Sequence, residues 1–372
     1  MSRSKISRNL NLPKHILHFL IILFLFILIA FPLFHLYLKG RVNKQITIDT
    51  SKGIDTLIAM QLDEQKHWIK LRGWNRNNPI ILFVHGGPGA PLFPHIKDLG
   101  YNTDLEKNYV IAYWEQIGTG KSFQNKIPDS IMTIDKFVTY TIKLSQYIKN
   151  KFSNPKLYII ARSWGSLISL FAVNKNPELF NGYISIGQLI YPLKNDSLSY
   201  EHTIKLAQRF NNNETLKKLE KVGYPPYNSE QIIKQRRWLT EFYHQFMEQK
   251  FGVKRQNQFV KLLSTPEYSI FDIIRMGKAP FFSIQHLWDE DFYQINLFNQ
   301  IETINIPITF IIGKYDFFTS PELTKKFYKE LNVPAGKELI EFKESGHHPE
   351  LEQPQKFKRI INRKLDSLTQ LE

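Results

Sequence analysis

The segment YIIARSWGSLISLF, residues 158–171, changes its pattern at Ser163. The residues before Ser163 form a short apolar run typical of a strand buried on both faces, and the residues after it have the pattern of a helix. Ala161 and Gly165, two positions before and after the serine, are small, as a sharp strand-to-helix turn requires where the two backbones approach closely. The segment therefore predicts a strand, a tight turn at Ser163 and a helix. The alternative is a serine that only caps the helix.

Short apolar runs of the same kind recur along the chain, and helix-length segments such as 134–151 separate several of them. Strands alternating with helices predict an α/β fold with a mostly parallel, doubly wound sheet. Residues 44–73 instead alternate apolar and polar side chains, which indicates antiparallel strands joined by a hairpin. The apolar runs are residues 80–84, 109–113, 157–161, 183–186 and 308–312.

The strand–helix alternation stops after residue 187 and resumes at IPITFIIGKYD. Residues 190–303 carry helix-like patterns rich in aromatic side chains. A helical block inserted between two sheet strands commonly covers a site at the carboxyl ends of the strands. We therefore expect a core of residues 45–189 and 304–372 and a helical cap of residues 190–303.

Residues 16–38, ILHFLIILFLFILIAFPLFHLYL, contain no formal charge if histidine is neutral. A helix of this length spans a hydrocarbon core of roughly 30 Å. The alternative is a cleaved signal peptide, but its apolar core is usually shorter and ends in small residues, whereas Leu28 precedes Ala30 by two positions. We expect one uncleaved transmembrane anchor after a basic segment of residues 1–15. That basic start favours a single-pass protein with its folded domain outside the cytoplasm.

The formal net charge of +15 is not gathered in one functional motif. Residues 1–52 hold eight basic residues and one acidic residue, so about half of the excess flanks the apolar segment. The chain has no recognisable nucleic-acid-binding motif, and we expect no nucleic-acid partner. The absence of cysteine excludes disulfides, thiolate metal sites and a cysteine nucleophile. No metal-ligand spacing is evident, so we expect neither a metal nor an organic cofactor.

Two glycine-containing loops follow predicted strands. In HGGPGAP, residues 85–91, the glycines allow backbone N–H groups to face a ligand, and such donors can stabilise an oxyanion. An ordinary turn is the alternative. The segment YWEQIGTGKSF, residues 113–123, does not have the spacing of a phosphate-binding loop, so it predicts a structural turn.

A carboxylate and a histidine also follow predicted strands near the C-terminus. Asp316 follows ITFIIG closely, and His347 and His348 follow ELIEF. The chain order serine, aspartate, histidine is that of α/β-hydrolases. In such a set the imidazole takes the serine proton, and the carboxylate fixes the imidazole tautomer.

Over roughly residues 45–365 the chain resembles an α/β-hydrolase of the proline iminopeptidase type. The resemblance implies a catalytic triad of Ser163, Asp316 and His347. It also implies an oxyanion hole formed by the backbone N–H groups of Gly87 and Trp164. The residues that carry it are HGGPG at 85–89, WEQ at 114–116 with Gly118, Gly120 and Ser122, SWGS at 163–166, Asp316, Gly346 and His347.

The chain departs from the family pattern at three places. Ala161 replaces the first glycine around the serine, and Ile117 stands where the family has arginine. Iminopeptidases also hold the substrate α-ammonium group with acidic residues of the cap. Asp196 and Glu201 are the candidates for that role, with a solvated helix face as the alternative.

The leading hypothesis is a membrane-anchored serine hydrolase that removes N-terminal residues, proline among them, from short peptides through an acyl-enzyme. A second hypothesis keeps the triad but gives it an ester, lactone or lipid-derived acyl substrate. A third is a catalytically silent binding protein that has kept the fold.

Overall fold

The computed structural model describes residues 13–152 and 156–370. In this part of the chain eight strands form one sheet in the order β1-β2-β4-β3-β5-β6-β7-β8. Strand β2 pairs antiparallel with β1 and β4, and the other neighbours pair parallel. The mostly parallel sheet is therefore confirmed, and so is the hairpin, which β1 and β2 form over residues 54–73. The expected strand pattern does not hold for residues 44–53: residues 44 and 45 end a helix, and residues 46–53 form a loop in which Ile46 and Ile48 are buried without a strand partner. The strands are β1 (Ile54–Leu62), β2 (Gln65–Gly73), β3 (Ile80–Val84), β4 (Val110–Glu115), β5 (Leu157–Arg162), β6 (Gly182–Ile186), β7 (Ile308–Gly313) and β8 (Lys337–Phe342).

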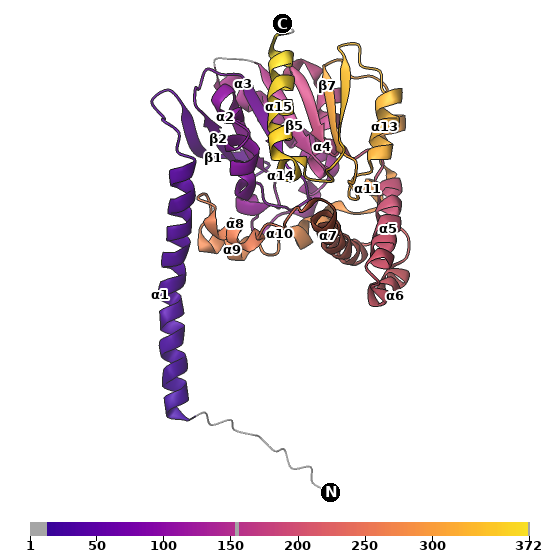
Figure 1. Cartoon of the computed structure of the whole chain (residues 1–372). Helices are drawn as coiled ribbons and strands as arrows, with labels where there is room; N and C mark the ends of the chain where they lie inside the picture. The colour runs from indigo at the N-terminus through magenta and orange to yellow at the C-terminus, as the bar shows by residue number, and fades with distance from the viewer. Residues whose placement is uncertain (1–12, 153–155, 371–372) are drawn as a thin grey trace.

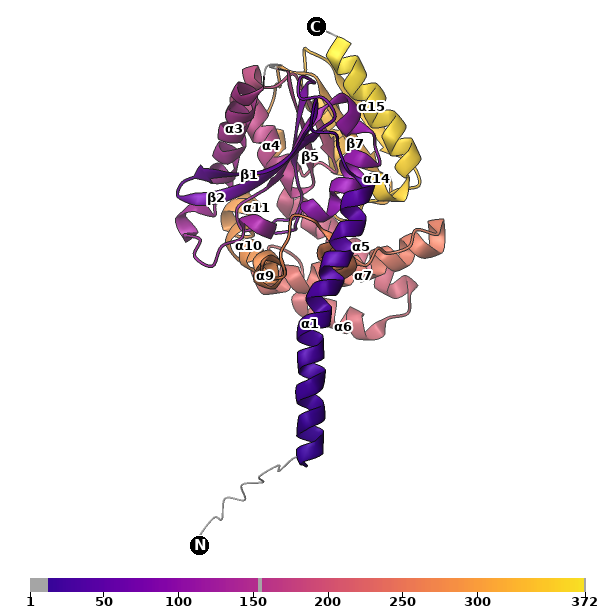
Figure 2. The ribbon, with the colours of Figure 1, turned by 90° about the vertical axis from the view of Figure 1, so that its left-hand side faces the viewer.

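Helices cover both faces of the sheet, and Figure 2 shows α3 and α4 on one side of it and α15 on the other. Such two-sided cover is what a parallel sheet needs, because both of its faces are apolar. The helices of this core are α2 (Leu105–Asn108), α3 (Ile134–Lys151), α4 (Trp164–Lys175), α13 (Pro321–Glu330), α14 (Pro349–Glu352) and α15 (Pro354–Gln370).

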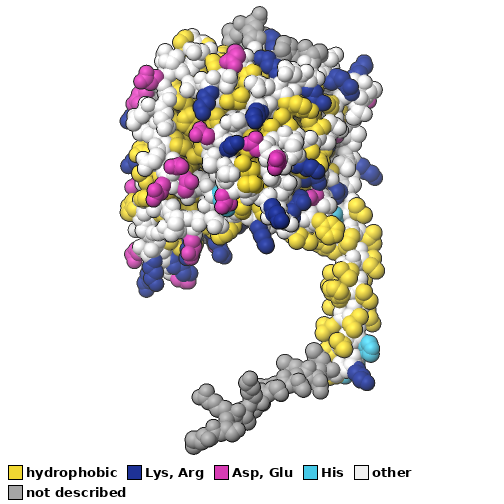
Figure 3. All heavy atoms as spheres, turned by 180° about the vertical axis from the view of Figure 1, so that it is seen from behind, with side chains coloured by type: hydrophobic (Ala, Val, Ile, Leu, Met, Phe, Trp, Pro, Cys, Tyr) yellow, Lys and Arg dark blue, Asp and Glu magenta, His cyan; other side chains and the backbone are white. Residues whose placement is uncertain are grey.

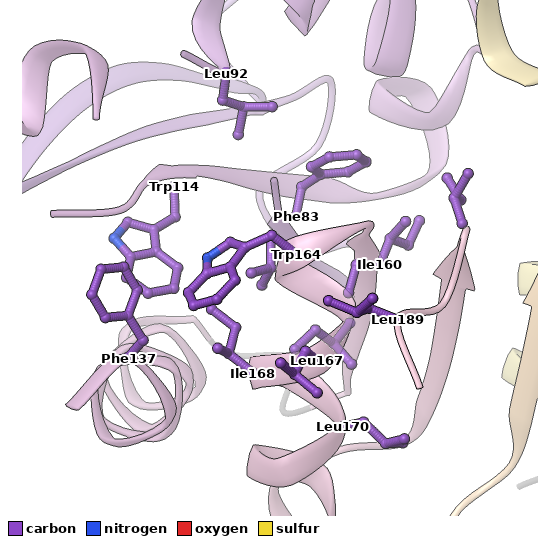
Figure 4. Packing of buried hydrophobic residues seen from close by; sticks show 14 of the residues in the cluster. Phe83, Leu92, Trp114, Phe137, Ile160, Trp164, Leu167, Ile168, Leu170 and Leu189 are labelled. Carbon is purple, nitrogen blue, oxygen red and sulfur yellow. The ribbon is translucent and has the colours of Figure 1, made fainter. Parts of the chain in front are cut away.

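The central strands are buried along their whole length. Every residue of β3, β4, β6 and β7 is buried, which accounts for their uninterrupted apolar sequences. The ring of Trp164, at the start of α4, meets the ring of Phe137 in α3 edge to face, with the centroids 5.9 Å apart. Figure 4 shows both rings beside Trp114 among aliphatic side chains. This packing fixes the start of α4 against the core.

A block of helices lies between β6 and β7 and occupies the lower part of the body in Figure 1. The predicted inserted cap is therefore confirmed, and its exact limits at residues 190 and 303 stay a prediction. The cap helices are α5 (Pro192–Arg209), α6 (Asn213–Val222), α7 (Ser229–Phe251), α8 (Gln258–Ser264), α9 (Ile270–Met276), α10 (Ala279–Leu287), α11 (Glu290–Gln294) and α12 (Leu297–Gln300).

Helix α1 (Lys14–Gln45) projects from the body on the side of the cap (Figure 1). It is longer than the apolar segment of residues 16–38, because it continues through polar residues up to the start of the folded core. Pro32 lies inside the helix without ending it. Of the helices in the described residues, α1 alone is long and apolar enough to cross a membrane. Residues 1–12 of the predicted basic segment, which covers residues 1–15, lie outside the described residues.

Candidate active site

Ser163 occupies a strained turn between β5 and α4. Its backbone has φ 49° and ψ −123°, a conformation that costs free energy for a residue with a Cβ. A Cβ on Gly165 would lie 2.4 Å from the carbonyl oxygen of His85, so this position must be glycine. Ala161 is fully buried within β5, so the turn accommodates a methyl group there. The Ser163 side chain makes no capping hydrogen bond to α4, unlike a serine whose role is to cap a helix.

Asp316 and His347 lie side by side after β7 and β8. His347 Nδ1 is 2.8 Å from Asp316 Oδ2, and both side chains are buried. Thr319 Oγ1 donates to Asp316 Oδ2 at 2.7 Å, and the backbone N–H groups of Phe318 and Thr319 donate to Oδ1. Burial alone raises the pKa of Asp316, but the charge of His347 and these hydrogen bonds outweigh it, so the pKa lies below its ordinary value. An ionised Asp316 holds the Nδ1 proton of His347 and leaves Nε2 able to accept another.

A cavity of about 410 Å³, which we call the Ser163 cavity, brings four of the five core site residues together. Ser163, His347, Gly87 and Trp164 line it, and Asp316 lies behind His347. Among the described residues, no hydrogen bond joins Ser163 Oγ to His347. Catalytic hydrogen bonds are often long in the absence of substrate and shorten when it binds.

A buried glutamine joins the two loops expected to form the oxyanion hole. The side chain of Gln116 accepts a hydrogen bond from Trp164 Nε1 at 3.0 Å and donates one to the carbonyl oxygen of His85 at 2.9 Å. Its backbone N–H donates to Nε2 of His85 at 3.1 Å. These bonds hold the loop that carries Gly87 against the start of α4. Gln116 belongs to the WEQ motif, but the motif alone did not indicate that this residue joins the two loops.

The preceding residue, Glu115, ties the same region to the cap. Its carboxylate accepts hydrogen bonds from the backbone N–H groups of Leu92 and Lys121, at 3.0 and 2.6 Å, and from the hydroxyl of Tyr268 in the cap. Burial raises the pKa of Glu115 to about 7, although these hydrogen bonds oppose the rise. Sequence reasoning gave Glu115 no role, because its partners lie far apart in the chain.

A tyrosine of the cap holds the loop of His347. The hydroxyl of Tyr243, on α7, accepts a hydrogen bond from the backbone N–H of His347 at 2.7 Å and donates one to Glu352. The cap therefore helps to place the imidazole as well as covering the cavity. No sequence signal distinguished Tyr243 from the other aromatic residues of the cap.

The two carboxylates considered for an α-ammonium group do not line the Ser163 cavity. Asp196 is buried, lies 2.6 Å from Nη2 of Arg236, and accepts hydrogen bonds from Trp288 and Tyr293. Glu201 is half-buried on α5. Of the described residues that line the cavity, none is aspartate or glutamate, whereas Arg162 and Arg236 both are lining residues. Ile117, the residue that stands where the family has arginine, is fully buried in the core.

The buried histidines are expected to make the fold sensitive to acid. Burial lowers the pKa of His67 to about 3 and that of His85 to about 4, from 6.5. Because folding lowers these pKa values, the unfolded chain binds more protons at acidic pH. The stability that these residues contribute is therefore complete above pH 6.5 and falls as the pH decreases toward the folded values. Each histidine should add about 1.4 kcal/mol per pH unit to that slope.

The substitution His67→Gln tests this dependence, because glutamine still offers an acceptor to Trp114 Nε1, which donates to His67 Nδ1 at 3.2 Å. Urea unfolding of both proteins at several pH values between about 7 and 5 gives the slope. The slope of the free energy of unfolding against pH should be smaller in the variant, by an amount that grows below pH 6.5 toward about 1.4 kcal/mol per pH unit. Equal slopes in the two proteins would contradict the neutral, buried state of His67.

The chain matches a family model and individual proteins of known sequence. Residues 79–354 match the model of a family described as the alpha/beta hydrolase fold. The probable aminopeptidase YbaC of Bacillus subtilis (strain 168) is 30% identical over 321 residues, which are 85% of this chain and 98% of that protein. A proline iminopeptidase of Heyndrickxia coagulans is 23% identical over 79% of this chain and 93% of that protein.

The structure is also similar in fold to a solved structure. The proline iminopeptidase-related protein of Thermus thermophilus matches with a TM-score of 0.57, covering 85% of this chain and 98% of that chain. Its sequence is 14% identical, so this likeness concerns the fold alone.

Proposed function

The chain belongs to the α/β-hydrolase family and is similar to proline iminopeptidases, and on this premise we propose that it is a serine hydrolase. Ser163 is the nucleophile, His347 the general base and Asp316 the residue that orients the imidazole. The observation that carries the proposal is the shared cavity: Ser163 and His347 both line it, and Nδ1 of His347 is 2.8 Å from Asp316.

The reaction proceeds in two acyl transfers. Ser163 Oγ attacks the substrate carbonyl carbon while His347 Nε2 takes the hydroxyl proton and then passes it to the leaving group. The backbone N–H groups of Gly87 and Trp164 stabilise the oxyanion of each tetrahedral intermediate. Water, deprotonated by His347, then attacks the acyl-enzyme and releases the acid. Gln116 supports both steps by holding the two oxyanion loops together.

Short peptides are the first candidate substrate, with cleavage after the N-terminal residue. Two relatives with aminopeptidase names support this assignment, and one of them matches over 98% of its length. A cavity of about 410 Å³ is also of a size for a small acyl group.

An ester or lactone with an uncharged or anionic acyl group is the second candidate. The lining of the Ser163 cavity favours it, because an α-ammonium group would meet two arginines and no carboxylate among the described lining residues. Arg162 is paired with Glu350 at 2.9 Å and Arg236 with Asp196, so both acidic partners are already engaged.

Substrates that differ only in whether the α-amine is free or acetylated distinguish the peptide candidate from the ester or lactone candidate. Prolyl and alanyl arylamides would be compared with their N-acetylated forms, alongside acyl esters of the same size. An aminopeptidase should prefer the free amine in kcat/KM by at least about 10²-fold, because the amine pairs with a placed carboxylate only when it is charged. Equal or faster hydrolysis of the acetylated forms and esters would assign the second candidate.

We also propose that α1 is an uncleaved, single-pass membrane anchor and that the folded domain lies outside the cytoplasm. Its length and apolar sequence support the anchor. Contacts of α1 with the domain support retention, since His35 Nδ1 donates to the carbonyl oxygen of Leu263 at 2.7 Å and Lys39 Nζ donates to that of Tyr268 at 2.8 Å.

A further inference from the structure

Large apolar side chains are exposed on three neighbouring cap helices, α8, α9 and α10. Phe271 is 82% exposed and Ile274 is 70% exposed, both on α9. Exposed apolar groups that gather in one place mark a surface that contacts a partner or a membrane. This surface, which we call the cap face, consists of Phe259, Val260, Phe271, Ile274 and Phe281.

Helix α1 is attached to the same cap helices. Nδ1 of His35, which is buried, donates to the carbonyl oxygen of Leu263 in α8 at 2.7 Å. Nζ of Lys39 donates to the carbonyl oxygen of Tyr268, in the turn before α9, at 2.8 Å. These contacts fix the direction in which α1 leaves the domain. In Figures 1 and 2 the N-terminal part of α1 extends beyond the side of the body on which α8, α9 and α10 lie.

The attachment lies at the level where the apolar segment of α1 ends. A hydrocarbon core of about 30 Å takes roughly 20 helical residues, so a span that begins near residue 16 ends near residue 35. His35 packs on the cap at this point, and Tyr37, which is exposed, is a residue type common at membrane interfaces. With α1 as the anchor proposed above, the cap helices that contact it would lie at the height of the lipid headgroups.

Basic side chains accompany the cap face. Arg237, Lys254, Arg255 and Lys278 are exposed on or beside α7 and α10. Figure 3 shows lysine and arginine side chains along the lower edge of the body, close to the start of the projecting α1. Apolar side chains flanked by basic ones suit a surface that inserts shallowly among anionic headgroups.

The Ser163 cavity adjoins the same side of the cap. A surface hollow between α7 and α10 shares Arg236, Thr240 and Ile284 with the cavity. Arg237 and Phe281 are among the residues on the outer side of this hollow. Arg236, Thr240 and Ile284 therefore border both the cavity and the hollow, and Phe281 of the cap face lines the hollow.

We propose that the cap face rests on the surface of the bilayer that holds α1, with the mouth of the Ser163 cavity turned toward the lipid. The proposal rests on the proposed anchoring by α1. The occupant of the cap face is the headgroup region of a bilayer that contains anionic phospholipid. Contacts of α1 with α8 and with the turn before α9 supply the geometry, and the exposed phenylalanines supply the apolar surface.

The natural absence of cysteine allows a direct test with single labels. Full-length variants Phe271→Cys, Phe281→Cys, Leu25→Cys and Tyr147→Cys would each carry one environment-sensitive fluorophore in vesicles of phosphatidylcholine and phosphatidylglycerol. Lipids with a spin label near the headgroup, or deep in the chains, quench nearby fluorophores. Tyr147 is the matched control, because it is an exposed aromatic residue on α3, away from the cap (Figure 1). Circular dichroism would show whether each variant is folded.

The labels at 271 and 281 should be quenched by the shallow spin label at least about twofold more than the label at 147. The label at 25 should respond most to the deep spin label. Labels at 271 and 281 that behave like the label at 147, while the label at 25 is quenched, would overturn the docking and leave the anchor intact. A label at 25 that no lipid quenches would overturn both the anchor and the docking.

Discussion

Replacing Ser163 with alanine is expected to lower kcat/KM by at least about 10³-fold, because the acyl-enzyme can no longer form. Some rate above the uncatalysed reaction should remain, since the N–H groups of Gly87 and Trp164 still bind the oxyanion. The measurement is steady-state hydrolysis of the best ester or arylamide substrate of the wild type. Circular dichroism would confirm that the variant keeps the fold.

Ser169 provides the matched control in the same helix. Its hydroxyl is fully buried and has no hydrogen-bond partner among the described residues, so Ser169→Ala removes no interaction. This variant should retain the activity of the wild type. If Ser163→Ala instead kept more than about a tenth of the wild-type kcat/KM, Ser163 would not be the nucleophile.

The second large effect is expected for Asp316→Asn. The backbone N–H groups of Phe318 and Thr319 would keep the amide oxygen at the Oδ1 position, so the amide NH₂ would face Nδ1 of His347. The imidazole would then present the wrong tautomer to Ser163, and kcat should fall by about 10⁴-fold. The value of kcat comes from initial rates measured at a pH at which both proteins stay folded.

Asp135→Asn is the comparison for this variant, because the Asp135 side chain is 91% exposed on α3 and does not line the Ser163 cavity. It should behave as the wild type does. A loss in Asp316→Asn of less than about tenfold would show that another group orients the imidazole.

Features that depend on neighbouring residues in the chain could be predicted from the sequence. The uninterrupted apolar runs form strands that are buried on both faces. A strand in such a position needs an apolar side chain at every residue, so the run itself predicts the position. The small residues on either side of Ser163 predicted the turn, since Gly165 has no room for a side chain beneath His85. The apolar N-terminal segment predicted the helix but not its end, because α1 continues as far as the contacts of Ile46 with the core.

Features that depend on distant partners could not be predicted. The surroundings of Asp196 illustrate this, because Arg236 lies on α7, Tyr293 on α11 and Trp288 directly after α10. Nothing near Asp196 in the sequence indicates that its charge is already neutralised. The role of Gln116, which bonds to residues from two other loops, is set in the same way by tertiary contacts.

The most direct test of the central claim is reaction of the full-length protein with a fluorophosphonate, followed by peptide mass spectrometry. An activated serine reacts because a neighbouring base increases its nucleophilicity, and an ordinary buried or capping serine does not. We expect a single adduct on the peptide that contains Ser163, none in Ser163→Ala, and much slower labelling in His347→Ala. A folded wild-type protein that stays unmodified, or that carries the adduct on another serine, would contradict the account and favour a catalytically silent binding protein.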